Sequence, residues 1–160
     1  MKFEKFLKFC GTRGTIVDTP DGQFLKLSNA FVKIPSGVNV IASLSMDAPE
    51  YIENIFDDFE NSDLCKAELT AAELPEPDSS PSKLRRIWSN DLNGKISVCN
   101  KIFGFIERTD HAYTFTEDQD DERIQDALVI TSGYGPEEYI SAIILDDDFY
   151  YKKITEKGNN

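Results

Sequence analysis

The sequence predicts an α+β fold, with a mainly antiparallel sheet or an open barrel and one or two helices. About eight to ten short segments with strand-like patterns are separated by turn residues. One amphipathic helix stands out before the middle of the chain. Strands and helices do not alternate, so a doubly wound parallel sheet is not expected. The 160 residues, 40% of them hydrophobic, are enough for one domain with its own core.

The N-terminal segment predicts a helix followed by short antiparallel strands. Residues 3–10 place apolar side chains at the i, i+3, i+4, i+7 spacing of one helix face, at Phe3, Phe6, Leu7 and Cys10. A looser alternation leaves a strand there as the alternative. A Pro-Asp-Gly turn at 20–22 predicts a hairpin between strands at 15–17 and 23–27. Further strands are expected at 30–34 and 38–42.

A second helix is expected over residues 47–61. Asp47 is the candidate cap, Pro49 suits the first turn, and Glu50 complements the positive end of the helix dipole. Apolar residues then follow at helical spacing, namely Ile52, Ile55, Phe56 and Phe59. The opposite face is acidic, with Glu53, Asp57, Asp58 and Glu60.

The second half of the chain is expected to be rich in strands. Residues 64–74 fit either an Ala-rich helix or a half-buried strand, and their alternation favours the strand. Three prolines predict an exposed, extended loop at 75–81, and residues 152–160 are expected to fray. The remaining strands are expected at 85–89, 95–99, 102–107, 112–116, 127–131 and 139–145, with a hairpin turn (Asn-Gly) between the first two.

The net charge of −12 is unevenly distributed along the chain. Residues 1–37 hold six bases and three acids, a net charge of +3, whereas the remaining residues hold 11 bases and 26 acids, a net charge of −15. The acids concentrate in 47–63, 117–126 and 146–148. Direct nucleic-acid binding is not expected of such a chain, because it needs clustered Lys and Arg. The asymmetry favours a partner with a basic surface, which includes another copy of this chain.

Two sets of residues are candidates for binding. The acidic clusters supply candidate partner-binding residues, although a solvated acidic surface is the simpler alternative: Asp57, Asp58, Glu60, Asp118, Asp120, Asp121 and Glu122. The candidates for an anionic ligand are Arg13, Arg85, Arg86 and Tyr134. Arg13 lies in a glycine-containing turn, and Tyr134 lies in an exposed Gly-Tyr-Gly-Pro segment. The two adjacent arginines precede Trp88, but strand alternation would send them to opposite faces.

No constellation of residues indicates catalysis or a cofactor. The single histidine, His111, is expected in a polar turn and stands beside no nucleophile. The acidic run at 118–122 lacks the glycine and glutamate of an EF-hand, while 146–148 leaves magnesium as an open alternative. The three cysteines have no zinc or redox spacing and are expected as reduced thiols, with Cys10 and Cys99 buried as small hydrophobes. No segment resembles a signal peptide or a membrane helix.

The segments 1–17 (MKFEKFLKFCGTRGTIV), 34–39 (IPSGVN) and 103–107 (FGFIE) resemble small proteins of tailed bacteriophages of gut and Firmicutes hosts. The resemblance is strongest over the first 40 residues and brings no catalytic motif with it. It implies either a virion component or a protein that acts on the host, located in the virion or in the host cytoplasm.

These observations together predict a non-enzymatic phage protein that works by protein binding or self-assembly. The alternative is an inhibitor of a host defence system. Such an inhibitor would act by acidic mimicry of nucleic acid or by sequestering a small nucleotide. No cofactor is expected for either function.

Overall fold

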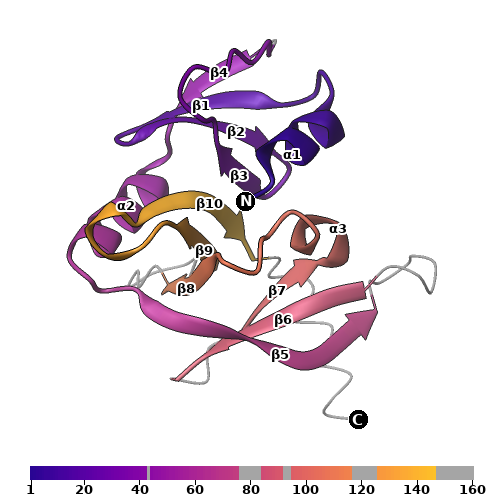
Figure 1. The fold of residues 1–160 in the computed structure, drawn as a ribbon, viewed down its shortest axis with the longest axis vertical. Coiled ribbons are helices and arrows are strands. Elements are labelled where there is room, and N and C mark those ends of the chain that lie inside the picture. The colour runs from indigo at the N-terminus through magenta and orange to yellow at the C-terminus, as the bar shows by residue number, and fades with distance from the viewer. Residues whose placement is uncertain (43, 76–83, 92–94, 117–125, 147–160) are drawn as a thin grey trace.

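A computed structural model describes residues 1–42, 44–75, 84–91, 95–116 and 126–146. The described residues form three α-helices and a ten-stranded, mostly antiparallel sheet that stays open (Figure 1). The predicted α+β class is confirmed. The loop expected at 75–81 is wrong at its first residue, because Pro75 ends a strand and pairs with Leu84, and its other residues lie outside the described ones. The expectations for the acidic residues 118–122 and the tail 152–160 also fall outside the described residues.

The helices are α1 (Phe3–Cys10), α2 (Glu50–Glu60) and α3 (Asn100–Phe103), with a 3₁₀ turn at Gly135–Glu137. The strands are β1 (Thr15–Thr19), β2 (Gly22–Leu27), β3 (Ala30–Lys33), β4 (Leu44–Asp47), β5 (Cys65–Pro75), β6 (Leu84–Asn90), β7 (Lys95–Cys99), β8 (His111–Thr116), β9 (Asp126–Ser132) and β10 (Tyr139–Leu145). Their order in the sheet is β4-β1-β2-β3-β10-β9-β8-β5-β6-β7.

The central strands β9 and β10 are buried on both faces, which explains why they read as nearly continuous apolar runs. In β9, Leu128 and Ile130 belong to one core cluster, while Val129 belongs to another on the opposite face. In β10 a bulge between Ile140 and Ala142 shifts the alternation by one residue. The sheet therefore separates two hydrophobic cores.

The helices cover the two faces of this sheet unequally. Helices α1 and α3 pack into one core, through side chains such as Phe6, Ile102 and the neighbouring Phe105. Helix α2 packs into the other core through Ile52, Ile55 and Phe56. Figure 1 shows α1 and α3 on one side of the central strands and α2 on the other. Side chains on the outer surfaces of these helices consequently face away from each other.

The strand expected at 38–42 is wrong, because β4 forms at Leu44–Asp47 and pairs in parallel with β1. Both edges of β3 are already occupied, by β2 and β10, so the chain that follows it has no strand to join. It reaches the free edge of β1 only at residue 44, and Ile41 remains 94% exposed. Asp47 also does not cap α2: it ends β4, and Pro49 precedes the helix without a side-chain cap.

The strand expected at 102–107 is also wrong. Residues 100–103 form α3. Turns follow it, in which the backbone N–H groups of Phe105 and Ile106 donate to the carbonyl oxygens of Ile102 and Phe103. Ile102 and Phe105, three residues apart, are both buried against the core that contains α1. This segment therefore forms a helix and turns that bury Ile102 and Phe105. It cannot pair with β8, which already has a neighbour on each edge. The polar turn expected at His111 is displaced as well, since His111 begins β8. The alternation at 64–74 is confirmed as strand β5.

Candidate functional site

Helix α2 presents a row of carboxylates to solvent. We define the acidic stripe as Asp47, Glu50, Glu53, Asp57 and Glu60, all of them exposed. Their spacing of three or four residues places the four helical members on one face. The opposite face is held by the buried Ile52 and Ile55, so packing of the apolar side directs the acids outward. Among the described residues no ion pair joins a member of the stripe to a base.

Like charges reinforce one another at the C-terminal end of α2. The pKa of the Asp58 carboxyl is raised above its ordinary value, first by partial burial and then by the neighbouring Asp63 and Asp57 carboxylates. The last turn of the helix contains no basic residue, so the negative end of the helix dipole adds to the same field. A cationic partner would relieve this repulsion.

Helices α1 and α3 form a basic surface around two aromatic rings. The Arg13 guanidinium lies 5.8 Å from the centroid of the Phe9 ring and donates to the Phe9 carbonyl oxygen at 2.9 Å. Lys101 of α3 places its Nζ 4.9 Å from the centroid of the same ring. Arg86 of β6 lies 5.0 Å from the centroid of the Phe103 ring, at the end of α3. We define the basic patch as Lys8, Arg13, Arg86 and Lys101.

The structure thus relates some of the predicted ligand residues and separates others. Arg13 contacts Phe9 of α1, Arg86 contacts Phe103 of α3, and both belong to the basic patch. Arg85 lies in β6 beside Arg86, and the structure describes its backbone but not its side chain. Tyr134 is 71% exposed and lies edge-on to His111, with 6.0 Å between the ring centroids. Of the predicted partner residues, Asp57 and Glu60 lie in the acidic stripe and Asp58 lies beside it.

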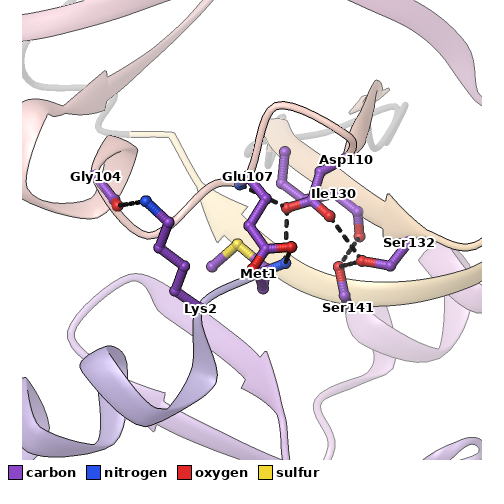
Figure 2. Close-up of polar contacts among 8 residues, drawn as sticks. All are labelled: Met1, Lys2, Gly104, Glu107, Asp110, Ile130, Ser132 and Ser141. Atoms are coloured by element: carbon purple, nitrogen blue, oxygen red, sulfur yellow. Dashed lines mark hydrogen bonds and ion pairs between the residues drawn. The ribbon is translucent and has the colours of Figure 1, made fainter.

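A separate polar cluster ties the start of the chain to β9 and β10 (Figure 2). The Met1 amino group lies 2.7 Å from Oδ2 of Asp110, and both side chains are almost fully buried. Ser132 donates to Oδ1 of Asp110 at 2.8 Å, and the Ser132 and Ser141 hydroxyls are 3.0 Å apart. The backbone N–H of Glu107 donates to Oδ2 of the same carboxylate at 2.9 Å. The cluster of Met1, Asp110, Ser132 and Ser141 therefore connects distant segments of the chain, and we call it the clip.

Two further kinds of side chain bear on the chemistry of the described residues: the potential metal ligands and the cysteines. In these parts of the chain no group of three His, Cys, Asp or Glu side chains is placed to hold a metal ion. Cys10 is fully buried, which raises the pKa of its thiol to about 11 although Arg13 acts in the opposite direction. A thiol with such a pKa is a poor nucleophile at neutral pH. Cys65 and Cys99 are free thiols as well, and both are only partly buried, so the expectation that Cys99 is buried is wrong.

A pocket of about 450 Å³ lies at the C-terminal end of α2, and we call it the end pocket. Its apolar walls include Phe59, Leu64 and Pro136. Tyr113 of β8 and Glu138, which precedes β10, also line it. The Tyr113 hydroxyl donates to Oε1 of Glu138 at 3.0 Å, and the hydroxyl of the buried Thr131 donates to the same oxygen at 2.6 Å. These two bonds fix the orientation of the Glu138 carboxylate.

A glycine makes the turn before Glu138 feasible. Gly133 has a φ of +88°, in the region that residues with a Cβ rarely adopt. A Cβ at this position would lie 2.7 Å from the carbonyl oxygen of Glu137, which is too close for any side chain. The Gly-Tyr-Gly-Pro segment, considered from sequence as a contact site, thus also determines where Glu138 lies.

Tyr113 should titrate at a higher pH than an ordinary tyrosine. Burial and the bond to Glu138 raise the pKa of its phenol above 10.0. The folded state then holds this proton more tightly than the unfolded chain, so the free energy of unfolding falls as the pH rises above about 10. Tyr113→Phe removes this part of the alkaline loss, which chemical denaturation at pH 9 and at pH 11 measures. An equal loss in both proteins would contradict the assignment.

Sequence reasoning missed three of the residues that build these features. Lys101 was not a candidate, because residues 102–107 were expected to be a strand and the adjoining α3 was not foreseen. Glu138 and Asp110 had no local signal, since their partners lie in other strands or at the start of the chain. Only the turn chemistry around Gly133 pointed to the neighbourhood of Glu138.

Comparison with family models, with curated proteins and with solved structures finds no match for this chain. Within the described residues, no helix combines the length and the apolar character needed to cross a membrane. The function must therefore be argued from the surfaces themselves.

Proposed function

We propose that this protein is a non-enzymatic binding protein that assembles with copies of itself through oppositely charged surfaces. One observation supports this most directly: helix α2, which carries most of the acidic stripe, packs on the opposite side of the sheet from helices α1 and α3, which carry Lys8 and Lys101 of the basic patch (Figure 1). A single chain cannot bring the two surfaces together. A second copy can, by placing its basic patch on the acidic stripe of the first.

Such an association is head-to-tail and not two-fold, because each copy uses two different surfaces. Head-to-tail contacts close into rings or continue as filaments, depending on the rotation between neighbours. Both forms are compatible with a virion component, which the phage-like segments of the sequence favour. Electrostatic contacts of this kind weaken as salt is added, because the Debye length falls from about 10 Å at 0.1 M to about 3 Å at 1 M.

The doubly reversed variant Glu53→Lys/Asp57→Lys should weaken self-association at least about tenfold, because it places like charges at the contact. The converse variant Lys8→Glu/Arg13→Glu should do the same. A mixture of the two variants should associate again, because the altered stripe now complements the altered patch. Sedimentation velocity at low and high salt measures all three.

The matched control is Glu68→Lys/Asp91→Lys, which changes the net charge equally at exposed positions outside both surfaces. This control should associate like the unchanged protein. A protein that stays monomeric at every concentration and salt level would overturn self-assembly. So would a mixture of the two charge-reversed variants that does not associate.

The acidic stripe also supports a second candidate, an inhibitor that imitates a phosphate backbone. Its four helical members follow one another along α2 without a basic residue between them. They could occupy the basic groove of a nucleic-acid-binding host defence protein. Competition with DNA for such a protein, lost in Glu53→Lys/Asp57→Lys, would favour this function. Unchanged competition by that variant would exclude mimicry by α2.

A further inference from the structure

We propose that the end pocket is a recognition site for an alkylammonium or alkylguanidinium group. The site goes beyond the charged surfaces, because it combines a shaped cavity with one oriented carboxylate. Two sources offer such a cation: a Lys or Arg side chain of a protein partner, or a free amine. The chemistry of recognition is the same for both.

The central group is the carboxylate of Glu138. Both hydrogen bonds that it accepts go to Oε1, from Tyr113 and from Thr131. Among the described residues Oε2 has no hydrogen-bond partner. A carboxylate held at one oxygen and unpaired at the other is already oriented for an incoming cation, which reduces the entropic cost of binding.

The walls of the end pocket suit the rest of such a ligand. Leu64 and Pro136 supply apolar surface for an alkyl chain, as the stems of Lys and Arg require. The aromatic residues Phe59 and Tyr113 also line the pocket, and the face of an aromatic ring attracts ammonium and guanidinium groups. The volume of about 450 Å³ is sufficient for one such side chain.

The electrostatic surroundings select the sign of the ligand charge. Glu60 lines the same pocket and is also the last member of the acidic stripe. The C-terminal end of α2 lies there without a basic residue in its last turn. No Lys, Arg or His is among the residues found to line this pocket. The carboxylates of Glu60 and Glu138 and the negative end of the α2 dipole would repel an anionic ligand and attract a cation.

The test uses n-butylammonium and n-butylguanidinium as probes, followed by two-dimensional amide NMR of the full chain. Both cations should give saturable shifts at residues around Tyr113, Leu64 and Glu138, and n-butanol and butyrate at the same ionic strength should not. Glu138→Gln, which keeps an acceptor but removes the charge, should weaken binding at least tenfold. The control Glu137→Gln, at an exposed position outside the pocket, should bind as the unchanged protein does.

Two results would overturn the site: equal shifts with n-butanol, or unchanged binding by Glu138→Gln. If that variant does not fold, Tyr113→Phe serves instead, because it keeps the ring and removes one of the two hydrogen bonds that Oε1 accepts. Unchanged cation binding by it would count against the oriented carboxylate. Self-association of Glu138→Gln then identifies the source. Weakened association supports a partner side chain, and intact association supports a free amine. Because Glu53 and Asp57 do not line the pocket, failure here leaves the self-assembly test unaffected.

Discussion

Asp110→Ala is expected to lower the free energy of unfolding by about 1–3 kcal/mol, the range for leaving partly buried hydrogen-bonding groups without their acceptor. The Met1 amine lies 2.7 Å from this carboxylate, and the exposed fractions of the two side chains are 3% and 2%. Without Asp110 the amine loses its closest carboxylate and keeps only that of Glu107, at 3.8 Å. The hydroxyl of Ser132 and the backbone N–H of Glu107 lose their acceptor as well.

Urea denaturation of protein whose chain begins at Met1 measures the effect. Glu107→Ala is the matched control, because Glu107 lies 3.8 Å from the same amine but its side chain is 46% exposed. That control should change the free energy of unfolding by less than about 1 kcal/mol. Losses of similar size in the two variants would show that the clip in Figure 2 does not depend on the buried pair.

Phe6→Ala is expected to cost about 3–5 kcal/mol, the usual penalty for emptying a fully buried phenylalanine site. Phe6 has no exposed surface and lies edge-on to Phe105, with 5.6 Å between the ring centroids. The same residue joins α1 to the turn after α3, and these elements hold the basic patch. The variant should therefore weaken self-association as well as folding.

Thermal and urea unfolding measure this loss, with Lys5→Ala as the control on the exposed face of the same helix. That control should stay within about 0.5 kcal/mol of the unchanged protein. If Phe6→Ala unfolded like Lys5→Ala, α1 would not be packed into the core as described. A Phe6→Ala protein that folds but associates normally would separate α1 packing from the proposed contact.

The two charged surfaces restrict how copies would meet in the proposed assembly. The acidic stripe follows from α2, whose apolar face must pack on the sheet and whose polar face contains no base. The basic patch depends on contacts between segments far apart in the chain, such as Lys101 above Phe9. Because α2 lies on the opposite side of the sheet from α1 and α3, growth beyond a dimer is the expected result of association.

The sequence alone determined the elements whose patterns are local. The helix at 3–10 follows from its apolar spacing, and the hairpin of β1 and β2 follows from the Pro-Asp-Gly turn. The acidic face of α2 follows from the helical spacing of its apolar and acidic residues. Each of these patterns repeats within one element. Chain neighbours are therefore enough to specify them.

Tertiary structure decided everything that depends on which strand edges are free and which distant residues meet. The chain at 38–42 has strand-like residues but finds no free strand edge beside β3. Residues 102–107 do not form a strand, because β8 already has a neighbour on each edge. The end pocket joins α2, β8 and the turn before β10, and the clip joins Met1 to Asp110. No local pattern encodes such meetings, because backbone pairing and burial are satisfied only across the assembled sheet.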